Sequence, residues 1–263
     1  MADIERPKVF ITGSSRGIGA ETAYTFASLG WDVAIGTHDK IRRAERVVKE
    51  LGEMGAGSIV VAGDLGDARE LEKAIDQVSE WAPRLSGLDL NAAIGLEDGV
   101  TEDDARHFNR DTQVELVNGL MPNLAEGSTV ALVMSNWAQH YRDNIHMPPF
   151  ERHGKTYDVV AGTKREGLEA LEESVVSRLS EKAIKFVVVT AGAVEGTPVA
   201  EYGLRGNPDF ARQERNYTTS AEHFGMRIAA AMVNPNHKSG DVIYVGGDSP
   251  EDFLSRWQIT EGE

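Results

Sequence analysis

The feature that most constrains this chain is a glycine-rich turn close to its start. Residues 8–19 read Lys-Val-Phe-Ile-Thr-Gly-Ser-Ser-Arg-Gly-Ile-Gly, and a helical pattern then continues to Gly30. Glycines between a strand and a helix let backbone N–H groups approach a pyrophosphate, whose negative charge the helix N-terminus favours. This strand–turn–helix context predicts that the chain binds a dinucleotide.

Strand-like and helical segments alternate along the whole chain. Short runs rich in Val, Ile and Leu predict strands, and the periodic patterns between them predict helices. The expected strands lie near residues 8–12, 32–36, 58–62, 87–91, 129–134, 185–190 and 241–245. The expected helices lie near residues 17–29, 40–54, 67–81, 101–124, 157–181 and 218–233. The alternation predicts an α/β fold, a single doubly wound parallel sheet (Rossmann fold) with helices on both faces, and we expect residues 1–263 to form one domain.

Two connections are longer than is usual in a compact domain. They run over residues 136–156 and 191–217, and each follows an expected strand. Long loops of this kind are usually lids or binding loops, and ligands bind at the carboxyl edge of a parallel sheet. We therefore expect both segments to act as lid loops over a ligand cleft.

Charge and composition exclude several classes of partner. The formal net charge is −15, whereas nucleic acids and anionic membranes attract clusters of Lys and Arg. The longest apolar runs, such as residues 186–189, are too short to span a bilayer. Cysteine is absent, which excludes disulfides and thiolate metal sites. Because the first expected strand begins near residue 8, we expect no signal peptide. We expect a cytoplasmic protein that binds neither nucleic acid nor membrane.

Further motifs follow the glycine turn along nearly the whole chain. Residues 64–65 read Asp-Leu after the third strand, residues 91–94 read Asn-Ala-Ala-Ile after the fourth, and residues 246–247 read Gly-Gly after the last. Together with the turn at residues 12–19, these motifs resemble the short-chain dehydrogenase/reductase family, whose fingerprint is Thr-Gly-x-x-x-Gly-x-Gly. The resemblance implies a nicotinamide dinucleotide cofactor, a small-molecule substrate and assembly into a homodimer or homotetramer.

The resemblance also assigns residues to the cofactor. The residues expected to bind it are Gly13, Ser15, Arg16, Gly17, Ile18, Gly19, His38, Asp64, Leu65, Asn91, Ala92, Lys164 and Thr197. Proteins that bind NAD place an acid at the end of the second strand, but here that end reads Ile-Gly-Thr-His, and no acid comes before Asp39. Arg16 and His38 are basic side chains of the kind that bind a 2′-phosphate. We therefore expect NADP(H) rather than NAD(H).

Reductases of this family use a Ser, a Tyr and a Lys for proton transfer, with the Tyr one helical turn before the Lys. Ser135 and Lys164 match two of these residues, and Asn109 matches the structural Asn of the family. The position of the usual Tyr, however, holds Val160. The nearest phenol is Tyr157, two helical turns before Lys164 and on the same helical face. The expected catalytic residues are thus Asn109, Ser135, Tyr157 and Lys164.

Tyr157 stands at the start of the helix that carries Lys164. We expect Thr156 to cap this helix, which places Tyr157 at its first position. There the phenol either supplies the missing proton, or packs the mouth of the cleft or binds substrate. An insertion precedes the helix, and its protic side chains are His140, Tyr141, His146 and His153. Because His titrates near neutral pH, one of them is an alternative proton donor. Their spacing matches no metal-ligand motif, and we expect no metal.

Three functions are compatible with these residues. The leading hypothesis is an NADP(H)-dependent oxidoreductase that reduces or oxidises a small carbonyl or alcohol substrate, with Tyr157 as a displaced acid. The second is non-redox chemistry, which is found among relatives that lack the usual Tyr. The third is a non-catalytic NADP(H) sensor, although a sensor needs neither Ser135 nor Lys164.

Overall fold

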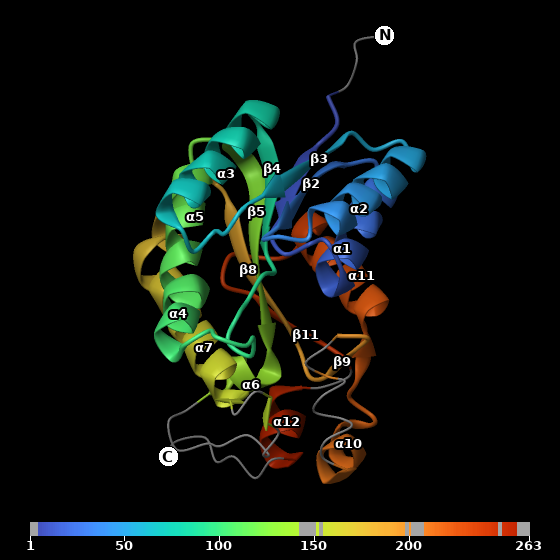
Figure 1. The fold of residues 1–263 in the computed structure, drawn as a ribbon, viewed down its shortest axis with the longest axis vertical. Coiled ribbons are helices and arrows are strands. Elements are labelled where there is room, and N and C mark those ends of the chain that lie inside the picture. Colours follow the sequence, from blue (N-terminus) through green and yellow to red (C-terminus); the bar gives the residue numbers. More distant parts are fainter. Residues whose placement is uncertain are drawn as a thin grey trace.

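The core of the protein is a seven-stranded sheet with the strand order β11-β8-β5-β4-β1-β2-β3 (Figure 1). The computed structural model describes residues 5–141, 151–152, 155–197, 200, 208–246 and 249–256. The strands of the sheet are β1 (Lys8–Ile11), β2 (Asp32–Thr37), β3 (Ser58–Ala62), β4 (Leu85–Leu90), β5 (Leu124–Ser135), β8 (Lys185–Ala191) and β11 (Val242–Val245). Every pairing in this sheet is parallel, which confirms the predicted doubly wound α/β fold.

Helices cover both faces of the sheet (Figure 1). One face carries α1 (Gly17–Ser28), α2 (Ile41–Glu53) and α11 (Ala221–Val233), and the other carries α3 (Ala68–Trp81), α5 (Gln113–Leu120) and α7 (Asp158–Ser174). Successive strand residues point to opposite faces, so Val9 and Ile11 join the core beneath α1 whereas Phe10 joins the core beneath α3. All three side chains are fully buried, which explains why the strand is continuously apolar.

The direction in which successive strands are added reverses next to β1. This strand pairs with β2 on one side and with β4 on the other, so that Phe10 lies between Ala34 and Leu88. The connections that leave β1 and β4 therefore run to opposite faces of the sheet. A crevice opens between them at the carboxyl edge, which is where ligands bind in folds of this kind.

The helix expected over residues 101–124 is divided into three parts. α4 (Glu102–Arg106) is followed by the π-helical turn η1 (His107–Thr112) and then by α5, and β5 already begins at Leu124. Residues on α5 keep the apolar spacing that predicted the helix. The wider π turn, however, rotates them about the helix axis relative to the residues of α4. Turns of this type often occur at functional sites, and this one contains Asn109.

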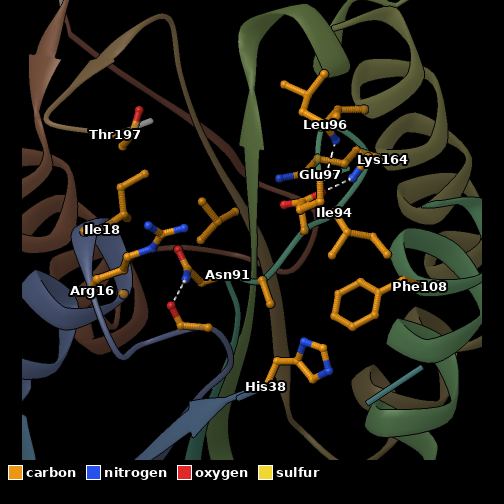
Figure 2. Close-up of a pocket in the computed structure, with 18 of the residues that line it drawn as sticks. Arg16, Ile18, His38, Asn91, Ile94, Leu96, Glu97, Phe108, Lys164 and Thr197 are labelled. Carbon is orange, nitrogen blue, oxygen red and sulfur yellow. Dashed lines mark hydrogen bonds between the residues drawn. The ribbon is translucent and has the colours of Figure 1, made fainter. Parts of the chain in front are cut away.

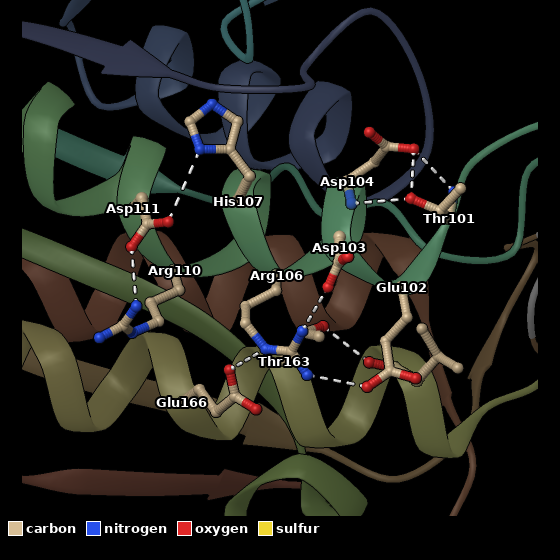
Figure 3. Close-up of polar contacts among 11 residues, drawn as sticks. Thr101, Glu102, Asp103, Asp104, Arg106, His107, Arg110, Asp111, Thr163 and Glu166 are labelled. Atoms are coloured by element: carbon tan, nitrogen blue, oxygen red, sulfur yellow. Dashed lines mark hydrogen bonds and ion pairs between the residues drawn. The ribbon is translucent and has the colours of Figure 1, made fainter.

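Arg106 ties α4 to α7 by a group of ion pairs (Figure 3). Its guanidinium nitrogens lie 2.9 Å from a carboxylate oxygen of Glu166, 2.8 Å from one of Glu102 and 2.8 Å from one of Asp103. The hydrogen bond to Glu166 is the largest cause that raises the pKa of Arg106. Since α7 carries Lys164, this group of contacts helps to fix the helix on which a predicted site residue lies.

The two long segments contain short elements. They hold α6 (Asn136–Gln139), the paired strands β6 (Glu151–Arg152) and β7 (Lys155–Thr156), β9 (Val194–Glu195) and α10 (Pro208–Glu214). The helix expected over residues 157–181 is interrupted at Val175 and continues as α8 (Val176–Glu181). Near the end of the chain lie β10 (Thr219–Ser220), which pairs with β9, and α12 (Pro250–Arg256). In the part of the chain that the structure describes, none of the helices has the length and apolar character needed to cross a bilayer.

Candidate functional site

A cleft of about 1000 Å³ lies at the carboxyl edge of the sheet, beside the start of α1 (Figure 2). Figure 2 shows Arg16, Ile18 and Thr197 on one side of it, and Phe108 and Lys164 on the other. Every residue that the sequence assigned to the cofactor lines this cleft. These residues are Gly13, Ser15, Arg16, Gly17, Ile18, Gly19, His38, Asp64, Leu65, Asn91, Ala92, Lys164 and Thr197.

The glycine turn leaves room for a bound phosphate group. Gly13 and Gly17 have φ values of +64° and +57°, a conformation that L side chains rarely adopt. A Cβ on Gly17 would project into open space, whereas one on Gly19 would lie 2.7 Å from the side chain of Asn91. Among the described residues, no side chain caps the N-terminus of α1. The first residues of the helix, Gly17 to Gly19, line the cleft, and a turn of this kind before a helix N-terminus fits the pyrophosphate of a dinucleotide.

Asn91 joins the ends of β4 and β1. Its backbone N–H donates to the Thr12 hydroxyl at 3.0 Å, and its side-chain amide donates to the Thr12 carbonyl at 2.9 Å. The N–H of Ala92 donates to the same hydroxyl, also at 3.0 Å. Thr12 is fully buried, so these bonds form a rigid floor beneath the middle of the cleft.

The end of the cleft next to β2 carries the basic residues. His38 follows β2, and its Nε2 lies 3.8 Å from a carboxylate oxygen of Asp64. Asp39 is the first acid after β2, and its carboxylate lies 2.5 Å from the ammonium of Lys40. The hydrogen bond to Lys40 is the largest cause that lowers the pKa of Asp39. The first acid after β2 is therefore already engaged by a cation.

Asn109 joins η1 to the loop after β4. Its side-chain amide donates to the Ile94 carbonyl at 2.8 Å and to the Thr163 hydroxyl at 2.9 Å, and its side-chain oxygen accepts from the Ile94 N–H at 3.0 Å. A Cβ on Gly167 would lie 2.0 Å from the Asn109 carbonyl oxygen, so only glycine permits this approach of α7. Asn109 does not line the main cleft; it positions the loop and the helix that do.

Ser135 and Tyr157 meet in the lining of the cleft. The Ser135 hydroxyl accepts a hydrogen bond from the Ala138 N–H at 3.1 Å, and the same side chain hydrogen-bonds Tyr157. Burial raises the pKa of Tyr157, and the hydrogen bond from Ser135 opposes this rise. The phenol is therefore protonated at neutral pH. Both residues line the cleft together with Lys164.

The start of α7 differs slightly from the expectation. The helix begins at Asp158, so Tyr157 is the residue before the first helical position rather than the first itself. Thr156 does not cap the backbone; its hydroxyl donates to the Asp158 carboxylate at 3.1 Å. The helix start thus differs from the expectation by one residue, and Asp158 in the first turn supplies the negative charge that a helix N-terminus favours.

Val160 fills the place from which the usual Tyr of the family would project. Its side chain is buried and lines the cleft. Gly95 has a φ of +141°, and a Cβ there would lie 2.8 Å from a methyl carbon of Val160. The loop after β4 thus packs directly on Val160.

Lys164 is electrostatically coupled to a residue that the sequence reading missed. Asp89 lies near the end of β4, is fully buried, and makes no hydrogen bond through either carboxylate oxygen to any described residue. Burial raises the pKa of Asp89 to about 8 and lowers that of Lys164 to about 8, while each opposes the shift of the other. The sequence signal that could have identified Asp89 is a single acid between two leucines, in the run Leu-Asp-Leu of a central strand.

The other protic residues of the insertion do not line the cleft where they are described. His140 contacts Tyr244, whose hydroxyl lies 2.9 Å from Nε2, and it stacks on the ring of Phe253 at 5.3 Å. Tyr141 packs on α7 with its ring 3.2 Å from where a Cβ on Gly162 would stand. His146 and His153 lie outside the described residues.

The comparisons with known proteins agree with this geometry. The model of the short chain dehydrogenase family matches residues 7–129. The short chain dehydrogenase/reductase AacuN of Aspergillus aculeatus is 31% identical over 140 residues, which are 50% of this chain and 52% of that protein. Versicolorin reductase stcU of Emericella nidulans is 32% identical over 134 residues, which are 49% of this chain and 51% of that protein. The matches thus span about half the length of these relatives.

A solved structure extends the similarity of fold to most of the chain. The short chain dehydrogenase from Burkholderia cenocepacia in complex with NADP has a TM-score of 0.74 and is 22% identical, and the match covers 92% of this chain and 96% of that one. The parallel sheet order and the similarity to this structure define a Rossmann-type α/β fold. The family match over residues 7–129, which is slightly less than half of the chain, and the similarity to these relatives support membership of the short-chain dehydrogenase/reductase family.

Proposed function

We propose that the protein is an NADP(H)-dependent oxidoreductase that interconverts a small carbonyl compound and its alcohol. The observation that carries the proposal is the hydrogen bond between Ser135 and Tyr157, which lie in the same cleft as Lys164 and the glycine turn. A hydroxyl, a protonated phenol and an amine around one cleft are the groups that proton transfer to a carbonyl oxygen requires.

The basic end of the cleft supports NADP(H) as the cofactor. The glycine turn and the start of α1 would hold the pyrophosphate, and Arg16 and His38 would hold the 2′-phosphate. No acid ends β2, and the first one beyond it, Asp39, is paired with Lys40. The NADP bound to the Burkholderia cenocepacia relative supports the same choice.

The chemistry divides between cofactor and chain. When bound, NADPH supplies a hydride to the carbonyl carbon. Tyr157 donates its proton to the carbonyl oxygen, a role that suits a phenol kept protonated by burial. The Ser135 hydroxyl accepts from the Ala138 N–H, so its own proton remains to orient the phenol or the substrate oxygen. The Lys164 ammonium stabilises the negative charge that develops on that oxygen.

The remainder of the cleft indicates a partly apolar substrate. Its lining beyond the reactive residues includes Ile94, Leu96, Trp137 and Val160. We also propose that the protein is cytoplasmic and forms a homodimer or homotetramer, as is usual in the family, and that residues 1–263 form one domain.

Two measurements test the proposal. Calorimetric titration should show NADPH binding at least about ten times more tightly than NADH, and a panel of ketones and aldehydes should include one that consumes NADPH. Tight binding of NADPH that none of the tested compounds causes to be consumed would favour a non-catalytic sensor. Conversion of a substrate at constant NADPH absorbance would favour non-redox chemistry.

A further inference from the structure

Trp137 forms part of the wall of the main cleft. It lies on the short helix α6, two positions after Ser135, and it is 6% exposed. Two hydrogen bonds fix the backbone of α6. The Ser135 hydroxyl accepts from the Ala138 N–H at 3.1 Å, and the buried side-chain oxygen of Asn136 accepts from the Thr190 hydroxyl of β8 at 2.9 Å. The orientation of the Trp137 indole is therefore decided by the side chains that pack against it.

A residue far along the chain packs against this indole. Phe253 lies on α12, beside α6 (Figure 1), and its ring meets the ring of Trp137 edge-on, with the centroids 5.0 Å apart and the planes at 78°. Phe253 is fully buried and does not line the cleft. Edge-to-face aromatic pairs are favourable, and protein interiors are close-packed. Phe253 therefore occupies space on the inner side of the indole, into which the indole would otherwise turn.

Phe253 is itself held by a histidine of the insertion. Its ring stacks on that of His140, with the centroids 5.3 Å apart and the planes at 23°. The Nε2 atom of His140 lies 2.9 Å from the hydroxyl of Tyr244, which comes from β11. His140 follows Trp137 by three positions, so Phe253 contacts two side chains of one short segment. A ring held in this way cannot move aside, and its size determines how much room the indole has.

We propose that Phe253 is a positioning residue that limits the size of the substrate through the orientation of Trp137. A carbonyl compound that places its oxygen beside Ser135 brings its larger substituent toward Trp137, the largest of the described residues that line the cleft. With Phe253 in place the indole has no space to turn away. The cleft therefore accepts carbonyl compounds with short aliphatic substituents in preference to those with aryl groups. The statement about substrates rests on the proposed function, whereas the statement about the indole does not.

Crystal structures of the full chain, as wild type and as Phe253→Ala, test the role of Phe253 without any substrate. The indole of Trp137 should turn into the vacated space, and the main cleft should become wider at that place. If Phe253→Ala fails to fold, Phe253→Leu takes its place, and a smaller turn in the same direction is expected. An indole that keeps its wild-type orientation beside an empty cavity overturns the proposal.

The choice between two methyl ketones, butanone and acetophenone, tests the statement about substrates. The measurement is the ratio of kcat/KM for acetophenone to kcat/KM for butanone, with NADPH as the reductant. This ratio should rise about tenfold in Phe253→Ala and in Trp137→Phe, and about threefold in Phe253→Leu, at unchanged KM for NADPH. The control is Asp252→Ala, on an exposed position of α12, which should leave the ratio at its wild-type value. Simple damage to the fold lowers both kcat/KM values together, so an unchanged ratio in Phe253→Ala overturns the proposal.

The double variant Trp137→Phe/Phe253→Ala shows whether Phe253 acts through Trp137. If it does, the double variant has the same ratio as Trp137→Phe alone, because there is no indole left to reorient. A further rise in the ratio means that Phe253 acts independently, and this overturns the proposal. If no variant and no wild-type protein reduces any ketone, the proposed function fails, and the crystal structures still decide whether Phe253 orients Trp137.

Discussion

Tyr157 hydrogen-bonds Ser135 although one precedes α7 and the other ends β5. The contact gives the phenol an oriented partner in place of the lysine one turn away that the family normally uses. We expect Tyr157→Phe to lower kcat by about 10²–10⁴, because the variant removes the proton donor and little else. NADPH affinity, measured by fluorescence titration, should stay unchanged. Full turnover by the variant would remove Tyr157 from the mechanism.

Tyr141 offers a matched control for this experiment. It is a neighbouring phenol that packs on α7 at Gly162 and does not line the cleft. Tyr141→Phe should therefore keep kcat within about twofold of the wild type, since it removes a hydroxyl outside the site. An equal loss in both variants would indicate that a damaged α7, not a missing proton donor, lowers the rate.

The fold was predictable because it rests on local patterns. The apolar runs that become β1, β4 and β8 alternate with helical periods, and each period implies a crossover. The glycine turn was equally predictable from the sequence. Gly13 and Gly17 have positive φ values, and Gly19 has no room for a Cβ, so all three positions favour glycine. These requirements act over a few residues, so the sequence shows them directly.

The details of the candidate site depend on contacts between distant segments. The π turn η1 lies where the Asn109 side-chain amide hydrogen-bonds Ile94 and Thr163. Helical periodicity in the sequence does not reveal such long-range hydrogen bonds. The contact between Ser135 and Tyr157 depends on the course of an insertion, and the coupling of Asp89 to Lys164 on strand register. The sequence supplied the residue types for these contacts but not their partners.

Cofactor preference should depend on the basic end of the cleft. We expect Arg16→Ala and His38→Ala each to weaken NADPH binding by about 10- to 100-fold, the effect of one charge-assisted hydrogen bond, and to leave NADH binding nearly unchanged. Arg42→Ala is the control, because Arg42 is exposed on α2 and does not line the cleft. Equal losses for both nucleotides in Arg16→Ala would mean that this residue binds the shared pyrophosphate and not the 2′-phosphate.

The contact between α7 and η1 should tolerate no side chain at Gly167. A Cβ there would lie 2.0 Å from the Asn109 carbonyl oxygen, so Gly167→Ala must push the two elements apart. We expect a loss of about 1–3 kcal/mol in the free energy of unfolding, measured by urea denaturation, and a fall in kcat as Lys164 moves with α7. Gly52→Ala is the control: nothing lies within 4 Å of its Cβ on α2, and it should stabilise by about 0.5–1 kcal/mol. A stabilised Gly167→Ala would contradict the packing described here.

The stability of the protein should fall with rising pH because of Asp89. In the unfolded chain this carboxyl loses its proton above about pH 4, whereas in the folded chain burial raises its pKa to about 8. Between these values the unfolded state is favoured by about 1.4 kcal/mol for each pH unit, and above pH 8 the effect levels off. Asp89→Asn cannot titrate, so its stability relative to the wild type should rise steadily from pH 5 to pH 8.

Asp76→Asn, on the exposed side of α3, is the control, and its stability should depend on pH in the same way as that of the wild type. Urea midpoints at four pH values measure the difference, and a constant gap between Asp89→Asn and wild type would show that Asp89 is ionised, and stabilised, within the fold. Lys164 does not disturb the comparison in this range, because burial lowers its pKa only to about 8 and the amine stays largely charged in both states below that pH.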